Sequence, residues 1–316
     1  MVEHQIVDRL VRHWNELNDL SRQVVAAPPK TLMLEVTNAC NLKCIMCTNP
    51  IMKRNKGTMP LSIAKQAISE AAKMGIQEIA LFTTGESLLY KNLTVLIIEA
   101  KRHGLYCYLT SNGLLLNREK CIGLCKAGLD SIKISVDGSN REEYERIRLG
   151  GDFLKLLKNI SLLRDIRDKL GSEMRISVSA VLLEENKKSI ENFKSYFSEL
   201  ADEILISPLS NQGGKIDRMD VQSNSTHKQI PVPCNQLWDR IVVTYTGEIS
   251  VCCIDFEAEL VYGDLRSSSL EKIWNSESMQ SFRRDHLTRN LDIHALCRDC
   301  NYPYLCNPEE LIKLNS

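Results

Sequence analysis

Three cysteines near the start of the chain have the spacing of an iron–sulfur ligand set. They are Cys40, Cys44 and Cys47, in the segment Cys-Asn-Leu-Lys-Cys-Ile-Met-Cys. Three thiolates can hold three irons of a 4Fe–4S cluster, whereas an ordinary electron-transfer cluster is closed by four cysteines. The spacing therefore predicts a cluster whose fourth iron is open to a small molecule. A zinc site or a loop of reduced thiols is the alternative, and the surrounding motifs decide between them.

A second set of cysteines lies near the end of the chain. A predicted hairpin presents Cys252, Cys234 lies 18 residues before it, and Cys297 and Cys300 form a CxxC pair. Four cysteines from a hairpin and a CxxC loop suit a closed 4Fe–4S cluster or a zinc ribbon.

The composition argues against several classes of protein. Of the 316 residues, 40 are Lys or Arg and 40 are Asp or Glu, so no basic field favours nucleic acid as a partner. No apolar run is long enough for a membrane span, and the first residues lack a signal-peptide pattern. Twelve cysteines in a chain with 43% apolar residues fit a small secreted disulfide protein poorly and favour a cytoplasmic, metal-binding one.

Hydrophobic periodicity predicts strands and helices that alternate over the first two thirds of the chain. An amphipathic helix over 2–24 comes first. Strands are expected at 31–36, 77–83, 105–110, 130–136, 175–182 and 203–207. Helices are expected at 61–74, 89–103, 117–127, 140–147, 153–170 and 187–200. This alternation predicts a parallel sheet with right-handed crossovers, and a doubly wound sheet remains open on the pattern alone.

The character of the sequence changes after Pro208. Residues 208–233 are polar and are expected to form a linker or a bridging loop. Residues 240–252 alternate as a β-hairpin around a Thr-Gly turn. Two short helices are expected after it, near 269–275 and 277–287.

Polar residues are expected to gather at the C-terminal edge of the parallel sheet, because they follow three consecutive strands. A carboxylate there would suit a ligand that carries an ammonium group, although turn chemistry also places Ser, Asn, Asp and Gly at strand ends. The candidate residues are Thr84, Gly85, Glu86, Ser111, Asn112, Ser135 and Asp137.

The order of these motifs resembles the radical S-adenosylmethionine (SAM) superfamily. The cysteine loop, the Glu turn, the Ser-Asn turn and the Ser-Asp turn follow strands one to four, as in that family, over about residues 31–207. Two departures are Met46, where the family usually has an aromatic residue, and Thr84, which replaces the first glycine of a Gly-Gly-Glu motif. The resemblance implies an α/β fold, a partial (β/α)6 TIM-like barrel, in which the cysteine loop holds the SAM-binding cluster.

The resemblance also implies roles for the polar turns. In the family, the turn after the second strand holds the SAM amino group through a carboxylate, which here is Glu86. The next two turns resemble the family's contacts with the SAM ribose and carboxylate, and Arg148 resembles a carboxylate-pairing arginine of relatives. The implied SAM-binding residues are Thr84, Gly85, Glu86, Ser111, Asn112, Ser135, Asp137 and Arg148.

The C-terminal part resembles the SPASM/twitch extension of radical SAM enzymes. The matching segments are Pro233-Cys234, Gly247–Cys253, Gly263–Leu265, Ser269–Ser276 and Leu296–Cys300. The full SPASM pattern has further cysteines. Cys306 satisfies one of these positions, but Glu310 stands at the next, so we expect one auxiliary 4Fe–4S cluster and not two. Its expected ligands are Cys234, Cys252, Cys297 and Cys300, with Cys306 as a substitute ligand or a structural thiol.

Three regions are therefore expected: an N-terminal helix over 1–30, a radical SAM core over 31–215, and a small C-terminal domain over 216–316 that uses a β-hairpin and helices to bind the auxiliary cluster. The expected cofactors are SAM and two 4Fe–4S clusters.

Family membership would make the chain an enzyme that cleaves SAM to a 5′-deoxyadenosyl radical, which abstracts a hydrogen atom from a substrate C–H bond. Relatives with a single auxiliary cluster include an aminoglycoside-pathway dehydrogenase. We therefore expect oxidation of a secondary alcohol in a small polar substrate, such as a sugar or aminocyclitol. Residues 1–30 are too few for a leader-peptide recognition module, which favours a small molecule over a peptide. The expected electron donor is of the flavodoxin or ferredoxin type, with no nucleic-acid or membrane partner.

One alternative depends on Cys253. It adjoins Cys252, so on a strand its side chain would point the opposite way. A free thiol near the substrate would return a hydrogen atom from the other face, as in radical SAM epimerases, whereas a buried thiol behind the cluster would explain the same pair. A peptide-modifying radical SAM/SPASM enzyme is the remaining alternative.

Overall fold

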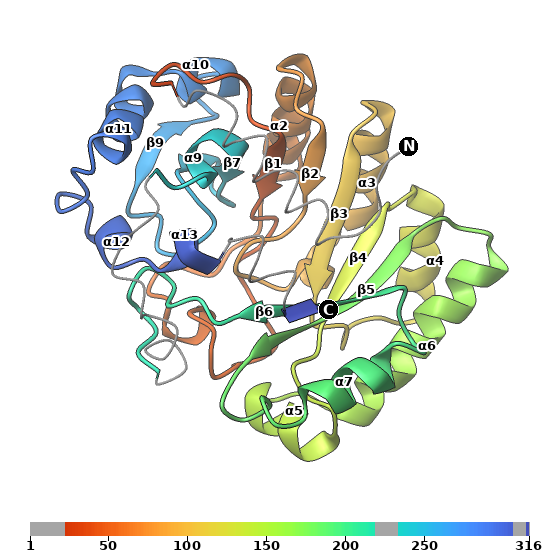
Figure 1. Ribbon diagram of the computed structural model, residues 1–316. Helices are drawn as coiled ribbons and strands as arrows, with labels where there is room; N and C mark the ends of the chain where they lie inside the picture. The colour runs from red at the N-terminus through yellow and green to blue at the C-terminus, as the bar shows by residue number, and fades with distance from the viewer. Residues whose placement is uncertain (1–22, 219–232, 306–313, 316) are drawn as a thin grey trace.

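The computed structural model describes residues 23–218, 233–305 and 314–315 of the chain (Figure 1). Nine strands form one continuous sheet in the order β6-β5-β4-β3-β2-β1-β7-β8-β9. The first six strands are β1 (Thr31–Leu34), β2 (Glu78–Ala80), β3 (Tyr106–Ser111), β4 (Ser131–Ser135), β5 (Arg175–Leu182) and β6 (Glu203–Pro208). Neighbouring strands from β1 to β6 are all parallel, which confirms the predicted alternation and the partial barrel.

The helices between these strands cover the outer face of the curved sheet, as Figure 1 shows. They are α2 (Leu61–Lys73), α3 (Leu93–Arg102), α4 (Arg118–Ala127), α5 (Arg141–Ile147), α6 (Phe153–Lys169) and α7 (Ile190–Phe197), with short 3₁₀ turns at η1 (Asn49–Ile51) and η2 (Ser87–Leu89). Asn117, Asn140 and Asp152 each accept a hydrogen bond from the backbone N–H three residues further on. These side-chain caps fix where α4, α5 and α6 begin.

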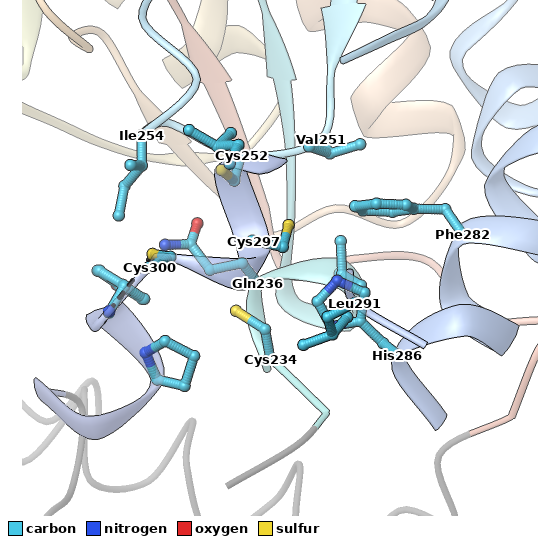
Figure 2. Close-up of a pocket in the computed structure, with 14 residues that line it drawn as sticks. Cys234, Gln236, Val251, Cys252, Ile254, Phe282, His286, Leu291, Cys297 and Cys300 are labelled. Carbon is cyan, nitrogen blue, oxygen red and sulfur yellow. Dashed lines mark hydrogen bonds between the residues drawn. The ribbon is translucent and has the colours of Figure 1, made fainter. Parts of the chain in front are cut away.

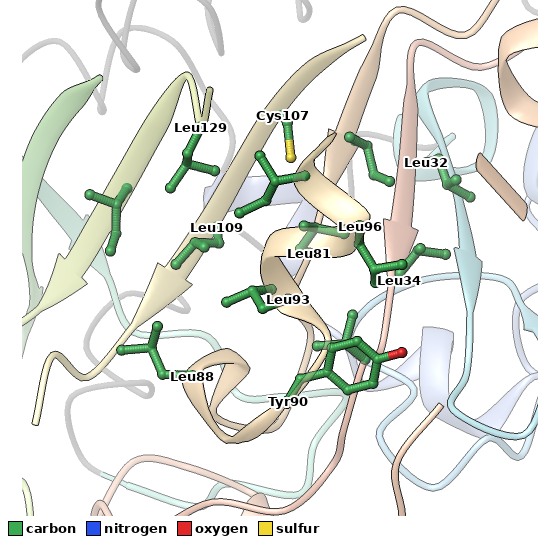
Figure 3. Close-up of a cluster of buried hydrophobic side chains, with 14 of the residues drawn as sticks. Leu32, Leu34, Leu81, Leu88, Tyr90, Leu93, Leu96, Cys107, Leu109 and Leu129 are labelled. Atoms are coloured by element: carbon green, nitrogen blue, oxygen red, sulfur yellow. The ribbon is translucent and has the colours of Figure 1, made fainter. Parts of the chain in front are cut away.

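The two faces of the sheet differ in what they bury. Leu32, Leu81 and Leu109 belong to the same large buried apolar cluster as Leu93 and Leu96 of α3 (Figure 3). The opposite, inner face has only a small apolar cluster of its own, Met33, Ala80 and Val242. Because the core lies outside the barrel, the inside is left for polar groups and a cavity.

The C-terminal region continues the sheet of the core. Strand β7 (Arg240–Val243) lies parallel to β1 with Leu32 opposite Ile241, and β8 (Glu248–Ser250) and β9 (Val261–Asp264) follow as antiparallel strands. The predicted hairpin is therefore present, but it extends the barrel sheet, and β9 was not predicted. The remaining helices are α9 (Gln236–Asp239), α10 (Leu270–Trp274), α11 (Glu277–Leu287), α12 (Ala295–Arg298) and α13 (Tyr302–Leu305).

Two predictions lie mostly or wholly outside the described residues: the helix over 2–24 and the position of Cys306. The predicted linker is described only as far as residue 218 and again at residue 233, so its central part stays a prediction. Within the described part of the chain, no helix has the length and apolar character needed to cross a membrane.

Candidate functional site

The first three cysteines line a cavity at the C-terminal ends of the barrel strands. Cys40, Cys44 and Cys47 border a cavity of about 260 Å³. Seven of the eight predicted SAM-binding residues line the same cavity: Thr84, Gly85, Glu86, Ser111, Asn112, Ser135 and Arg148. The topology thus brings together the polar turns that follow β2, β3 and β4.

Backbone contacts hold the cysteine loop against the rest of the cavity. The N–H groups of Lys43 and Ile45 donate to the carbonyls of Leu149 and Ile147, and the N–H of Glu86 donates to Ala39. Gly85 lies so close to this loop that an added Cβ would be 2.1 Å from the Thr37 carbonyl oxygen. A glycine is therefore required where the turn after β2 meets the loop.

Burial keeps the three thiols protonated in the absence of a cation. It raises the pKa of Cys47 to about 11, and the pKa values of Cys40 and Cys44 are raised for the same reason. Arg148 opposes the shift at Cys44, with its Nη1 3.6 Å from Cys44 Sγ. Thiolates at these positions would need a positive partner, which a cluster's iron supplies.

Asp137 is the predicted SAM contact that does not line the cavity. Its side chain is 1% exposed and accepts from Arg148 Nε at 2.5 Å and from the Val181 N–H at 2.7 Å. Burial opposes the charge of Arg148, but the Asp137 carboxylate outweighs it, so the pKa of Arg148 is raised. Asp137 therefore does not contact the cavity itself. It orients the Arg148 guanidinium toward the cysteine loop.

Glu86 forms the centre of a second buried network. Its carboxylate accepts from Ser111 Oγ at 2.7 Å, from the Asn112 N–H at 2.8 Å and from the Leu88 N–H at 3.0 Å. Burial raises the pKa of Glu86 although these bonds favour the charged form. One acidic side chain therefore couples the turns after β2 and β3 at the cavity wall.

The second set of cysteines surrounds a separate, largely apolar cavity, shown in Figure 2. Cys234, Cys252, Cys297 and Cys300 all line it. Burial raises the pKa of Cys297 to about 12. Among the described residues, no three His, Cys, Asp or Glu side chains lie close enough to hold a single metal ion, so these cysteines surround a space and do not meet at a point.

The wall of this second cavity contains polar atoms that need a partner. Gln236 and His286 are 1% and 2% exposed, and the Gln236 Nε2 and both ring nitrogens of His286 have no hydrogen-bond partner among the described residues. Sulfur-only ligands with buried donors around them fit an iron–sulfur cluster, whose sulfides accept hydrogen bonds.

Cys252 and Cys253 face different cavities. Cys252 lines the second cavity, the one bordered by Cys234, Cys297 and Cys300, which we call the auxiliary cavity. Cys253 lines the cavity of the first three cysteines. Both residues follow the end of β8, so the opposite orientation expected for strand neighbours persists past the strand. The Cys253 thiol donates to Gln236 Oε1 at 3.7 Å.

Sequence patterns missed a clamp between the cysteine loop and the C-terminal region. Arg54 makes a two-point ion pair with Glu35 at 2.6 and 2.9 Å, and Glu257 accepts from the backbone N–H groups of Lys53 and Arg54. Tyr245 donates its hydroxyl hydrogen to the Asn55 carbonyl. No local signal marks these residues, because Glu257 lies 204 positions from Lys53.

Comparison with known families identifies the class of protein. Residues 34–197, just over half of the chain, match the model of the radical SAM superfamily, and residues 234–301 match SPASM, an iron–sulfur cluster-binding domain. The chain therefore belongs to the radical SAM superfamily and carries a SPASM domain. These domains imply SAM and 4Fe–4S clusters as its cofactors.

Several named relatives align over half of the chain or more. The PqqA peptide cyclase of Gluconobacter oxydans is 25% identical over 282 residues, which cover 79% of this chain and 77% of the cyclase. The tungsten-containing aldehyde ferredoxin oxidoreductase cofactor-modifying protein of Pyrococcus furiosus is 25% identical over 88% of this chain and 89% of its own length. The PqqA peptide cyclase of Rhodopseudomonas palustris is 31% identical, over 50% of this chain and 41% of the cyclase.

Solved structures of radical SAM enzymes share the fold. Streptococcus suis SuiB bound to its precursor peptide SuiA has a TM-score of 0.67 at 14% identity, over 94% of this chain and 74% of SuiB. BtrN in complex with AdoMet and 2-DOIA has a TM-score of 0.59 at 20% identity, over 86% of this chain and 93% of BtrN. At such identities the likeness establishes the fold alone.

Proposed function

We propose that the chain starts a radical reaction on a peptide substrate in the cavity of the first three cysteines. The observation that carries the proposal is the meeting of Cys40, Cys44 and Cys47 with the polar turns after β2, β3 and β4. When bound, the cluster and SAM supply a 5′-deoxyadenosyl radical that removes a hydrogen atom from a substrate C–H bond. The three thiolates would each hold one iron, which leaves the fourth iron for SAM.

The polar residues of the cavity would bind and orient SAM. Glu86 offers the carboxylate for the amino group. Ser111, Asn112 and Ser135 offer hydroxyl and amide groups for the ribose. Arg148, held by Asp137, offers a cation for the carboxylate of SAM. In the second cavity, Cys234, Cys252, Cys297 and Cys300 would hold one auxiliary cluster and so define the C-terminal domain.

The relatives favour a peptide over the small sugar expected from the sequence. The cyclase of Gluconobacter oxydans, named for the PqqA peptide, aligns over most of both chains, and SuiB was solved with a precursor peptide bound. The test is anaerobic turnover with peptides encoded near the gene and, in parallel, with aminocyclitols. We expect 5′-deoxyadenosine and a changed mass only for a peptide. Turnover of an aminocyclitol with no peptide modified would refute the peptide assignment.

The cluster assignment has its own test. Changing Cys40, Cys44 and Cys47 together to Ala should abolish formation of 5′-deoxyadenosine under reduction while the auxiliary cluster remains. Cys125→Ser is the matched control, because Cys125 is a buried thiol on α4 outside both cavities. If the triple variant still produced 5′-deoxyadenosine, the assignment would be wrong.

A second candidate function rests on Cys253, whose thiol faces the cavity. If this thiol returns a hydrogen atom to the substrate radical, the product is inverted and not oxidised. In D2O an epimerase would place deuterium on the product carbon, and Cys253→Ala would stop turnover after one abstraction. In oxidation of a secondary alcohol, the product would lose two hydrogens and carry no solvent deuterium on that carbon.

The electron for SAM cleavage is proposed to come from an acidic flavodoxin- or ferredoxin-type protein in a reducing, cytoplasmic setting. Residues 41–57 contain no acidic residue, and Lys43, Lys53 and Lys56 on this segment are exposed. None of the three has an ion-pair partner among the described residues, and Ile51 beside them is 55% exposed. A basic rim with an apolar centre next to the cluster loop complements an acidic donor.

Charge reversal tests this surface. Changing Lys43, Lys53 and Lys56 to Glu should slow turnover driven by flavodoxin at low salt by at least tenfold and leave turnover driven by dithionite unchanged. The control reverses three exposed lysines elsewhere, Lys158, Lys169 and Lys188, and should change neither rate. Equal losses in both variants would rule out a docking role for the loop.

A further inference from the structure

Gln236 lies between the two cavities. It is the first residue of α9, two positions after Cys234, and its side chain is almost fully buried. Its amide borders the auxiliary cavity, and Figure 2 shows it among the sulfur atoms of Cys234, Cys252, Cys297 and Cys300.

The two ends of this amide have different surroundings. Oε1 accepts from the thiol of Cys253, which lines the other cavity. Nε2 is buried and has no partner among the described residues. A single side chain therefore contacts the thiol that faces the substrate cavity and offers a free donor to the auxiliary cavity.

A buried amide donor without a partner is costly, because it has lost its hydrogen bonds to water. The auxiliary cavity offers Nε2 few acceptors, because much of its wall is aliphatic or aromatic, as at Val251, Ile254, Phe282 and Leu291. The acceptors that the cavity is built to hold are the sulfurs of a cluster and of its cysteine ligands. Hydrogen bonds to those sulfurs tune the reduction potential of a cluster.

We propose that Gln236 is a positioning residue that bridges the two sites. Its Nε2 donates to the sulfur of the auxiliary cluster, and its Oε1 fixes the direction of the Cys253 S–H. The hydrogen bond from Nε2 to the cluster and the orientation of the Cys253 thiol are then coupled through the planar amide group of Gln236. This inference rests on the proposed function only in taking the auxiliary cavity as a cluster site.

The test uses the chain with Cys40, Cys44 and Cys47 changed to Ala, so that only the auxiliary cluster is present. Gln236→Met removes both hydrogen bonds at similar volume, and Leu291→Met alters the same wall without touching a polar group. A redox titration followed by EPR should show that Gln236→Met disfavours reduction about tenfold, which is about 59 mV for one electron. Leu291→Met should leave the potential unchanged.

The second readout is the S–H stretching band of Cys253 in the infrared spectrum, identified by its loss in Cys253→Ala. Gln236→Met should shift this band to higher frequency, because the thiol loses its acceptor. If either the potential or the band is unchanged, the bridge is refuted. Should Gln236→Met fail to fold, Gln236→Asn is expected to give both changes, because it is one methylene too short to reach both partners. Neither readout needs SAM or substrate, so failure of the bridge is separable from failure of the proposed peptide chemistry.

Discussion

Asp137→Asn should destabilise the protein without altering its backbone. Asp137 has a φ of 69°, in the left-handed region that Asn tolerates well. The substitution keeps an oxygen for the Val181 N–H but places an amide in place of the carboxylate that faces Arg148. The Arg148 guanidinium, only 12% exposed, would then carry a buried charge without its acidic partner.

The size of the loss follows from this burial. Removing one partner of a buried ion pair typically costs about 3–5 kcal/mol, whereas replacing both partners by apolar groups is often nearly neutral. Asp137→Asn alone should therefore lower the free energy of unfolding by about 3 kcal/mol. In the double variant Asp137→Asn/Arg148→Met most of that loss should disappear, so the double variant should be more stable than Asp137→Asn alone by about 2 kcal/mol.

Urea denaturation under anaerobic conditions, followed by tryptophan fluorescence, measures these values. The matched control is Asp168→Asn, because Asp168 pairs with Arg167 at 2.8 Å but is 58% exposed. Such a surface pair should contribute less than about 1 kcal/mol. A loss at Asp137→Asn no larger than at Asp168→Asn, or a double variant no more stable than Asp137→Asn, would refute the reasoning.

Three further predictions concern the two sites. Gly85→Ala should reduce SAM cleavage more than tenfold, since its Cβ would meet the Thr37 carbonyl, whereas Gly123→Ala in α4, whose Cβ would meet only the Thr94 methyl group at 3.1 Å, should keep most activity; equal rates would contradict this packing. Burial lowers the pKa of His286 to about 4 from 6.5, so stability is full above pH 6.5 and is lost as the pH falls toward 4. Between pH 7.5 and 5.5, wild type should lose about 1 kcal/mol more in urea unfolding than His286→Leu, and equal losses would be inconsistent with the shift. Reconstituted protein should contain about eight irons per chain from two four-iron sites, and a count near twelve, or zinc in place of iron, would exclude that arrangement.

Periodicity and turn chemistry were sufficient to predict the barrel half of the fold. All six predicted strands and the helices between them are present, because each buries a face that its own spacing reveals. The cavity-lining turns were also predictable, since parallel strands bring their C-terminal ends to one edge. Asp137 shows the limit of that argument: position on an edge does not say whether a side chain reaches the ligand or a neighbouring arginine.

The partners of β1 and β9 were not predictable from local patterns. The pairing of Leu32 with Ile241 joins strands far apart in the chain, and alternation reveals which face a strand buries but not which strand it meets. Strand β9 is short, partly exposed and contains Gly263, which packs against Ile273. Such an edge strand has no periodic signal of its own, and its register comes from the tertiary contact.

The pairing of β7 with β1 explains how adjacent residues serve two sites. Because β7 and β8 belong to the same sheet as β1, the chain that leaves β8 passes between the inside of the barrel and the auxiliary cavity. Cys252 then faces one cavity and Cys253 the other. A separate domain joined by a flexible linker would not hold these two thiols in a constant relation to the first cysteine loop. Chemistry that needs a radical, a thiol and an auxiliary cluster in fixed positions therefore depends on the continuity of this sheet.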